Sequence, residues 1–131
     1  MYMNGKKTLG GVGEEFAANY LRKKGYRIIE RNHRNKCGEI DIIARSKDRA
    51  IIFVEVKTME SFKGGNGLVP EDQLTRAKLK KFQKAAMLYI GSHKKLMDEE
   101  RGMRLDVIAI VKREKNFLVR HYENVLEIWR Y

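Results

Sequence analysis

The sequence of 131 residues predicts an α/β sandwich in which helices flank a central mixed β-sheet. Two helical patterns separate groups of strand-forming segments, two neighbouring segments read as one hairpin, and a nearly continuous apolar segment follows the second helix. A strand of that last kind, reached through a helical crossover, is typical of a sheet with parallel pairs. The expected order is α-β-β-β-α-β, and the chain length fits a single domain over residues 1–131.

The first helix is expected over residues 9–24, where apolar residues recur at helical spacing and Gly25 ends the pattern. Glu14 lies at the edge of the apolar stripe, because apolar residues stand three, four and seven positions after it. Its neighbour Glu15 points outward. The helix dipole favours acids in a first turn, which accounts fully for Glu15 and only in part for Glu14.

Three strands are expected after this helix, over residues 26–31, 38–45 and 50–58. The last two are rich in β-branched residues and are separated by a short polar stretch, as in a β-hairpin. Side chains alternate across a strand, so the apolar positions of both arms share a face only if even-numbered residues pair with even-numbered residues. A three-residue loop at 47–49 meets this condition with paired numbers that sum to 96. Sums of 94 or 98 would shift each pair by one diagonal neighbour and keep the same residues on one face.

This register sets charged residues opposite one another, with Asp41 facing Glu55 and Glu39 facing Lys57. Directly opposed residues have Cβ atoms ~5 Å apart, and like charges there destabilise the pair. Open solvent or a cation held between the carboxylates would offset that cost. A solvated polar face is the simpler interpretation, but the same face also carries large apolar residues. Asp41 followed by Glu55-Val56-Lys57 therefore indicates metal-assisted hydrolysis of a phosphodiester.

The second helix is expected over residues 70–90, with Pro70 in its first turn and Gly91 as its end. Four of its cations form a basic stripe: Arg76, Lys80, Lys81 and Lys84. A stripe of this kind is either a solvated helix face or a set of contacts to nucleic-acid phosphates.

The expected strand over residues 105–111 is nearly all apolar, as in a central strand that is buried on both faces. Its acid, Asp106, is expected to have a structural role, paired with Arg104 or a backbone amide. A last strand is expected over residues 117–122. The glycine-rich segment 59–69 is interpreted either as a loop that closes over a substrate or as an ordinary surface loop.

The chain is basic, because 28 Lys and Arg residues against 17 Asp and Glu residues give a formal net charge of +11. This excess favours an anionic partner, with nucleic acid before an acidic membrane surface, although a merely basic and soluble protein also fits. No apolar stretch is long enough to cross a membrane, so we expect no membrane partner and a cytoplasmic location. Cys37, the single cysteine, has no partner for an internal disulfide and lacks the neighbouring Cys and His residues of a zinc site.

The hairpin motif resembles that of the restriction-endonuclease-like superfamily, in which an Asp, a gap and Glu-x-Lys lie on a hairpin and are often joined by a Glu from the first helix. More closely, the chain resembles the YraN-type family of small bacterial proteins within this PD-(D/E)xK superfamily. The matching elements cover almost the whole chain: Gly13-Glu14, Ala17 and Tyr20-Leu21; Gly38-Glu39-Ile40-Asp41; Phe53-Val54-Glu55-Val56-Lys57-Thr58; Lys78, Ala85-Ala86 and Tyr89; Arg104-Leu105-Asp106-Val107; and His121 with Asn124. The resemblance implies a restriction-endonuclease-like fold.

The resemblance and the opposed carboxylates together predict a nuclease that hydrolyses phosphodiester bonds with Mg²⁺ or Mn²⁺ as its cofactor. Asp41 and Glu55 are expected to hold the metal. The carbonyl oxygen of Val56 and the carboxylate of Glu14 are expected to complete its ligand shell, the latter directly or through water.

Two further side chains are expected to assist catalysis. Lys57 would orient the attacking water or neutralise the developing charge. Glu39 would steer Lys57 or serve as a further acid. The basic stripe would hold the backbone of a nucleic acid, with DNA expected before RNA. A likeness in arrangement to the archaeal Holliday-junction resolvases adds branched DNA to the expected substrates.

Two other functions are compatible with the sequence. A non-catalytic nucleic-acid-binding module would retain the fold and bind in a salt-sensitive manner without metal-dependent turnover. A protein-interaction role, such as a homodimer formed through the tail that carries Trp129, is the other.

Overall fold

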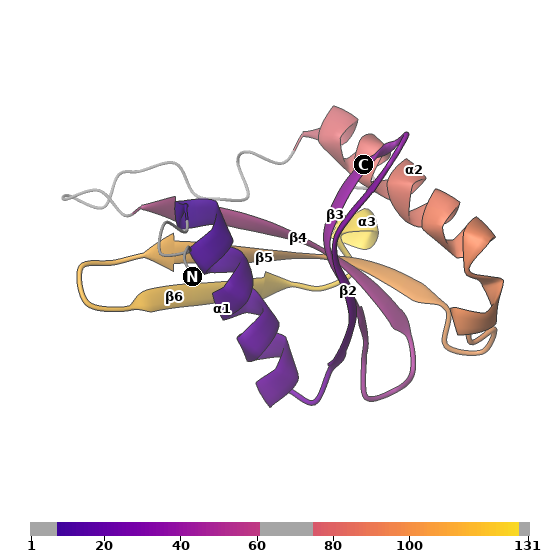
Figure 1. The fold of residues 1–131 in the computed structure, drawn as a ribbon, viewed down its shortest axis with the longest axis horizontal. Coiled ribbons are helices and arrows are strands. Elements are labelled where there is room, and N and C mark those ends of the chain that lie inside the picture. The colour runs from indigo at the N-terminus through magenta and orange to yellow at the C-terminus, as the bar shows by residue number, and fades with distance from the viewer. Residues whose placement is uncertain (1–7, 61–74, 129–131) are drawn as a thin grey trace, which may run out of the picture.

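The computed structural model describes residues 8–60 and 75–128. Its elements in chain order are α1 (Leu9–Lys23), β2 (Arg27–Asn35), β3 (Gly38–Arg45), β4 (Ile51–Glu60), α2 (Arg76–Ser92), the 3₁₀ turn η2 (Lys94–Leu96), β5 (Met103–Lys112), β6 (Phe117–Tyr122) and α3 (Val125–Ile128). Figure 1 shows the helices packed around one twisted sheet. The predicted fold class, an α-β-β-β-α-β arrangement with a mixed sheet flanked by helices, is confirmed.

The sheet has five strands in the order β2-β3-β4-β5-β6. The β4–β5 pair is parallel, and the other three pairs are antiparallel. A parallel pair needs a crossover connection, which α2 supplies between β4 and β5. The sequence-based expectation of a central strand after the second helix is therefore correct, and residues 105–110 of β5 are buried.

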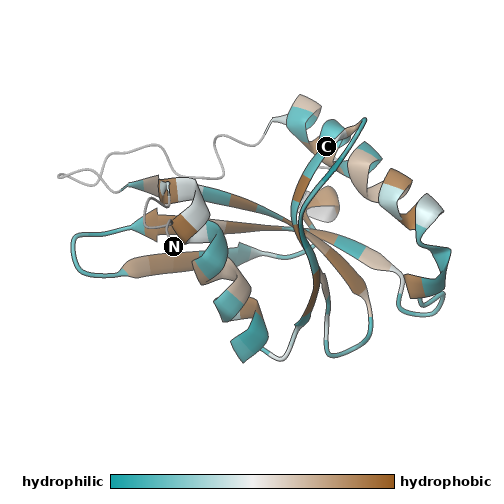
Figure 2. Cartoon of the chain, viewed as in Figure 1, coloured by the Kyte–Doolittle hydropathy of each residue, from teal (hydrophilic) through white to brown (hydrophobic). Residues whose placement is uncertain are grey.

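Two apolar clusters lie on opposite faces of the sheet. One joins α1 to the sheet through Ala17, Ala18 and Leu21, and the other joins α2 to it through residues that include Phe82 and Tyr89. Figure 2 shows the corresponding concentration of apolar residues along the central strands. The helices thus cover different faces, so a side chain from α1 and one from α2 reach the hairpin from opposite sides.

The helix boundaries follow local capping chemistry. The side chain of Thr8 accepts a hydrogen bond from the Gly11 N–H at the start of α1. The side chain of Thr75 accepts one from the Lys78 N–H at the start of α2. Gly25 follows α1 with φ of 93°, the left-handed conformation expected at a helix end. The second helix continues through the expected end at Gly91 to Ser92. Its expected start at Pro70 lies outside the described residues.

The strand expected over residues 26–31 is longer than the sequence indicated, because β2 runs to Asn35. It is an edge strand, paired only with β3 in the described sheet. Polar residues on such a strand can face solvent while their backbone pairs on one side. Likewise β4 extends to Glu60, so the first two residues of the expected loop over 59–69 belong to a strand. The rest of that loop and Trp129 lie outside the described residues.

In the described part of the chain, no helix is long and apolar enough to cross a membrane.

Candidate active site

The β3–β4 hairpin has the register that parity predicted. Ile42 pairs with Val54 and Ala44 pairs with Ile52, so the paired numbers sum to an even value. The backbone ladder ends at the Ile42–Val54 pair. Asp41 with Glu55, and Glu39 with Lys57, are therefore not ladder pairs as predicted: the two strands separate where these residues begin.

The separation of the strands coincides with a change of face within β3. Ile42 packs on the α1 side, while Ile40 and Ile43 both pack on the α2 side. Strict alternation would place Ile40 with Ile42, so the alternation breaks at Asp41. Figure 1 shows β2 and β3 curving away from β4 at this end. Asp41 consequently lies at the point where β3 and β4 separate.

Asp41 compensates for the lost ladder with its side chain. Its Oδ2 accepts a hydrogen bond of 2.7 Å from the backbone N–H of Val56. In an extended strand the N–H and C=O of one residue point to the same side, so the Val56 carbonyl also points toward β3. A carboxylate and a backbone carbonyl oxygen therefore lie on the same side of β4 at the opening.

Glu14 reaches this region because α1 lies unusually close to β4. A Cβ atom on the neighbouring Gly13 would lie 2.0 Å from Thr58 Oγ1, which is far inside van der Waals contact. Only glycine permits that approach. Glu14 is half-buried, and its Oε1 is a buried atom without a hydrogen-bond partner. The next residue, Glu15, forms an ion pair of 2.7 Å with Arg31 of β2.

Glu55 and Lys57 lie on the α2 side of β4, since β4 alternates and Phe53 packs against α2. Glu55 Oε2 is buried and has no hydrogen-bond partner. The Lys57 ammonium is 3.9 Å from that oxygen, an ion-pair distance that is too long for a hydrogen bond. Glu14 and Glu55 thus approach Asp41 from the α1 and the α2 side respectively. We refer to Glu14, Asp41 and Glu55 as the carboxylate site.

The pKa of each acid in the carboxylate site is raised above its ordinary value. For Glu14 the cause is burial and then the charge of Asp41, opposed by Arg31. For Asp41 burial outweighs the hydrogen bond from Val56 and the charge of Lys57. Burial also raises the pKa of Glu55, with Lys57 opposing it and Asp41 adding to it. Burial without sufficient compensating positive charge therefore disfavours the ionised form of all three.

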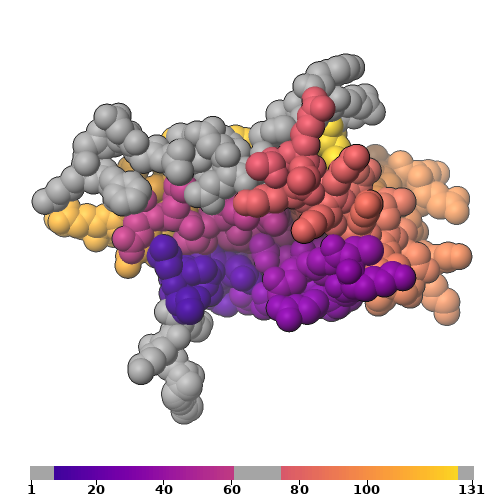
Figure 3. Space-filling model, turned by 90° about the horizontal axis from the view of Figure 1, so that it is seen from above, coloured from indigo at the N-terminus to yellow at the C-terminus, as the bar shows by residue number. Residues whose placement is uncertain are grey.

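A cleft of about 260 Å³ opens beside Glu55 and Lys57. Its other lining residues come from the β3 end and from α2: Gly38, Glu39, Lys78, Lys81 and Phe82. Figure 3 shows the surface of α2 adjoining that of β2 and β3. The cleft therefore has acids on the hairpin and lysines on both walls.

Glu39 lines the cleft, but its carboxylate is bound by Arg34 across the β2–β3 pair. The distance from Arg34 Nε to Glu39 Oε1 is 3.1 Å. The predicted opposition of Glu39 to Lys57 does not form, because β3 and β4 have separated at that level.

The four cations of the predicted basic stripe are all exposed on α2. None of them forms an ion pair with another described residue. Lys81 lines the cleft, whereas Arg76, Lys80 and Lys84 continue along the helix. Sequence reasoning missed Lys78 as a lining residue. The sequence signal that could have identified Lys78 is the absence of any Asp or Glu from residues 76–92, which leaves every lysine of the helix as a candidate for binding an anion.

Sequence reasoning also missed Arg31. The sequence placed it at the end of the expected strand over residues 26–31, where it lies within β2, but gave no sign that its side chain reaches α1. Its guanidinium is fixed by Glu15 and acts on the pKa of Glu14.

Asp106 lies in a second group of buried polar residues, away from the cleft lining. It is fully buried and accepts two hydrogen bonds from Arg104, each 2.9 Å long. His121 Nε2 donates at 2.7 Å and the Asn124 N–H at 2.9 Å. We refer to these four residues as the Asp106 network.

Burial would raise the pKa of Asp106, but the hydrogen bonds from His121 and Arg104 outweigh it and hold that pKa below its ordinary value. The His121 ring also contacts the Tyr20 hydroxyl of α1 at 3.1 Å. The predicted structural role and the predicted partner Arg104 agree with these contacts.

The carboxylate site has the oxygen donors that a hard divalent cation prefers: three carboxylates and a backbone carbonyl. Its two unpartnered buried oxygens, Glu14 Oε1 and Glu55 Oε2, fit such a role. Within residues 8–60 and 75–128, no three His, Cys, Asp or Glu side chains are already gathered closely enough to hold a metal. The reason is the placement of Glu14 and Glu55 on opposite faces of the sheet.

The element order, the mixed sheet and the hairpin with its Asp and Glu-x-Lys agree with the α-β-β-β-α-β arrangement that the motifs indicated. The chain belongs to the uncharacterised protein family UPF0102, whose family model matches residues 13–110. This confirms the family resemblance that the motifs indicated.

Relatives named UPF0102 protein match most of the chain. One from Syntrophomonas wolfei subsp. wolfei is 41% identical over 118 residues, covering 90% of this chain and 96% of the relative. One from Geotalea daltonii is 45% identical over 109 residues, covering 83% and 80%. One from Alkaliphilus oremlandii is 37% identical over 118 residues, covering 90% and 97%.

A solved structure described as "Structure of EndoMS-dsDNA2 complex" is similar with a TM-score of 0.40 and 10% sequence identity. The match covers 88% of this chain and 41% of that chain, so the present chain spans less than half of it. Similarity at this level carries no argument about what the present chain binds or cleaves.

Proposed function

We propose that this protein is a metal-dependent nuclease that hydrolyses phosphodiester bonds of DNA. The observation that carries the proposal is the pair of buried carboxylate oxygens without hydrogen-bond partners, Glu14 Oε1 and Glu55 Oε2, with Asp41 between them. A buried polar atom left unpaired costs about 1–3 kcal/mol, and more if the group is charged. A divalent cation would supply the positive charge that the site lacks.

Mg²⁺ or Mn²⁺ suits this set of donors, because hard cations take carboxylate and carbonyl oxygens and keep several waters. Asp41 and Glu55 would hold the metal, joined by the Val56 carbonyl oxygen and, directly or through water, by Glu14. When bound, such a metal lowers the pKa of a water and stabilises charge on the phosphate. A bound cation would offset the mutual repulsion of Glu14, Asp41 and Glu55.

Lys57 is the residue that we assign to the reacting phosphate. Its side chain is 24% exposed and lines the cleft together with Glu55. There its ammonium would orient the attacking water or neutralise the charge that develops on the phosphate. Glu39 is held by Arg34, so in this proposal it acts as a further acid at the cleft rim and does not steer Lys57.

The cations of α2 would hold the nucleic-acid backbone. Lys81 reaches into the cleft together with Lys78, while Arg76, Lys80 and Lys84 project from the helix beyond it. Contacts to phosphates set position and affinity without reading sequence. The proposal therefore includes no base preference.

The decisive experiment is a panel of labelled single-stranded, duplex, flap, four-way-junction and RNA substrates, incubated with Mg²⁺ or Mn²⁺. Asp41→Ala should reduce cleavage at least about a thousandfold, since the loss of ~4 kcal/mol of transition-state stabilisation has that effect. Binding should remain nearly intact. Asp48→Ala is the matched control, because it removes the same charge from the loop at the other end of the same hairpin. An Asp41→Ala variant as active as Asp48→Ala would refute the assignment.

A non-catalytic nucleic-acid-binding module is the second candidate. The observation that favours it is the absence of a gathered metal-ligand set among the described residues, with Asp41 Oδ2 already bound to the Val56 N–H. It predicts salt-sensitive binding without turnover on any substrate of the panel. Cleavage that requires a divalent metal and Asp41 would exclude it.

A further inference from the structure

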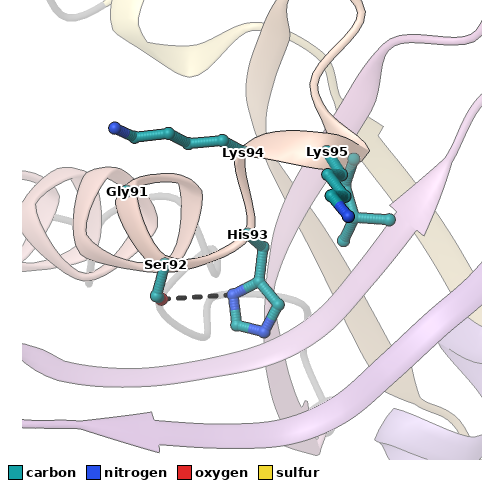
Figure 4. A pocket seen from close by; sticks show the side chains of 6 residues that line it. Gly91, Ser92, His93, Lys94 and Lys95 are labelled. Carbon is teal, nitrogen blue, oxygen red and sulfur yellow. Dashed lines mark hydrogen bonds between the residues drawn. The ribbon is translucent and has the colours of Figure 1, made fainter.

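A second hollow lies at the far end of α2 from the cleft. It has a volume of about 480 Å³ and is lined by residues 91–96. Figure 4 shows the side chains of Lys94 and Lys95 extending from this turn in different directions. Both lysines are exposed, and the space above Gly91 is open. We call Gly91, Lys94 and Lys95 the distal patch.

The turn that carries the distal patch is rigidly held. The His93 ring stacks on Tyr89 with centroids 3.9 Å apart, and its Nδ1 lies 2.9 Å from the Tyr89 carbonyl oxygen. The Leu96 N–H bonds the His93 carbonyl, and Arg45 Nη2 bonds the Leu96 carbonyl at 2.6 Å. Lys94 and Lys95 therefore project from an ordered base, which lowers the entropy that binding would cost.

Arg76, Lys80, Lys81 and Lys84 on this side of the molecule form no ion pair with another described residue. The helix carries no Asp or Glu between Arg76 and Ser92. Among the described residues neither Lys94 nor Lys95 forms an ion pair. The next acids, at residues 98–100, follow in the adjoining turn, and Asp98 among them is paired with Arg49.

Several cationic side chains elsewhere in the molecule differ from these lysines in having acidic partners. Arg31, Arg34 and Arg49 each have an acidic partner within the protein. Lys80, Lys81 and Lys84 of α2, together with Lys94 and Lys95, form no ion pair within the described residues and remain available to an external anion. Their spacing favours an extended anion over a small one. The C-terminal end of a helix is partly negative, so a phosphate near Ser92 would need side-chain cations beyond the helix, where Lys94 and Lys95 lie.

The length of α2 fits several base pairs. A helix of 17 residues spans about 25 Å, and the part from Lys81 in the cleft to Ser92 spans about 16 Å. At a rise of about 3.4 Å per base pair, the second length equals about five base pairs. Figure 1 shows α2 leading away from the open end of the hairpin.

The character of this surface favours double-stranded DNA over a single strand. Binding of single strands uses exposed aromatic rings on which bases stack. The aromatic residues of α2, Phe82 and Tyr89, are buried, and its exposed large apolar residue is Met87. A row of cations without exposed rings suits a duplex, which offers its phosphates and keeps its bases stacked.

We propose that α2 is a docking surface for a double-stranded DNA arm that extends from the cleft, and that the distal patch binds its phosphates about five base pairs from the cleft. This inference rests on the proposed function only in taking DNA as the substrate, and it concerns binding rather than cleavage. It assigns Lys94 and Lys95 a function that the cleft itself does not need.

The test measures binding of a fluorescent 20-base-pair duplex and of one of its strands, by anisotropy in EDTA over a range of salt concentrations. Lys94→Gln/Lys95→Gln is compared with Lys112→Gln/Lys115→Gln, which removes the same charge from the β5–β6 turn at the opposite end of the molecule (Figure 1). For the distal pair, the slope of log affinity against log salt on the duplex should fall in magnitude by about 2, one for each lysine. The control pair should keep the wild-type slope.

The outcomes separate this inference from the proposed function. Equal slopes for the two double variants on the duplex would overturn the distal patch. An equally large effect on the single strand would overturn the duplex assignment, and so would binding to anionic lipid vesicles but not to DNA. Because EDTA removes divalent metals, a protein that cleaves nothing can still confirm the docking surface. Conversely, metal-dependent cleavage that survives in Lys94→Gln/Lys95→Gln leaves the catalytic proposal intact whatever the slopes show.

Discussion

The carboxylate site and the Asp106 network both bury acids, but their surroundings treat those acids in opposite ways. Asp106 is fully buried and accepts four hydrogen bonds from side chains and backbone. Glu14 and Glu55 each keep a buried oxygen without a hydrogen-bond partner, and Asp41 accepts one hydrogen bond, from the backbone. The pKa of Asp106 is accordingly lowered, whereas the pKa values of the three site acids are raised.

This difference distinguishes Asp106, which stabilises the fold, from the acids of the carboxylate site, whose buried oxygens lack hydrogen-bond partners. Buried polar groups are normally satisfied, so an unsatisfied group in a native protein requires an explanation. The Asp106 network connects β5, β6 and, through Tyr20, α1. In the carboxylate site, the hydrogen bond from the Val56 N–H to Asp41 connects β4 to β3, but the buried oxygens of Glu14 and Glu55 form no such link. Perturbed pKa values beside a cleft favour a functional role for the carboxylate site.

The largest expected effect on the free energy of unfolding comes from replacing Asp106, the acid at the centre of the Asp106 network. Asp106→Ala removes the buried acceptor of Arg104 and His121, although Arg104 keeps its ion pair of 3.3 Å with the exposed Glu123. Breaking a buried pair costs about 3–5 kcal/mol. Urea denaturation should show that loss in the free energy of unfolding. Asp48→Ala, in an exposed loop, should change it far less. A cost below ~1 kcal/mol for Asp106→Ala would remove the contrast between the two regions.

The next effect tests how α1 serves the carboxylate site. In Gly13→Ala the added Cβ would meet Thr58, so α1 must move and the free energy of unfolding should fall by about 1–3 kcal/mol. Thr58→Ala should recover part of that loss in the double variant, because it removes the atom that Cβ would meet first. Additive effects of the two substitutions would show that the close approach of α1 to β4 does not depend on this contact.

The smallest effect concerns the unsatisfied acids. Asp41→Asn and Glu55→Gln should leave the free energy of unfolding unchanged or raise it by up to about 1 kcal/mol near neutral pH, because each removes a buried charge that lacks compensation. A raised pKa means that ionisation disfavours the folded state, so this gain should shrink as pH falls toward the ordinary pKa values of the two carboxyl groups.

Asp106→Asn should behave in the opposite sense. The lowered pKa of Asp106 means that its ionised form stabilises the fold above pH 3.8, and this stability is lost as pH falls through the folded-state pKa. Denaturation of each variant and the wild type at several pH values checks both signs. A loss of stability for Asp41→Asn as large as that for Asp106→Asn would place both acids in one class.

Much of the fold could be predicted from the sequence because its signals are local. Helical spacing located α1, the parity of apolar residues fixed the hairpin register, and the apolar run located β5. The extension of β2 could not be predicted, since edge strands tolerate polar residues that otherwise indicate a loop. The register was right, but the separation of β3 and β4 beyond Ile42 depends on tertiary packing that no pairing rule contains.

The candidate site could be predicted as a set of residues but not as an arrangement. Spacing identified Asp41, Glu55 and Lys57, and the stripe edge identified Glu14. Their division between the two faces follows from the packing of α1 and α2 on opposite sides of the sheet and from the alternation of β4. The break of alternation at Asp41 is a backbone property that no spacing rule contains. Lys78 was missed because a helical pattern alone does not show which residues turn toward a neighbouring strand.

Metal binding by the carboxylate site is the central claim, and titration of the metal-free protein with Mn²⁺, followed by electron paramagnetic resonance, tests it most directly. The wild type should bind one Mn²⁺ that Mg²⁺ displaces. Asp41→Asn and Glu55→Gln should lose this binding, and Asp48→Asn should keep it. Mn²⁺ binding of the same strength in Asp41→Asn, or none in the wild type, would contradict the claim.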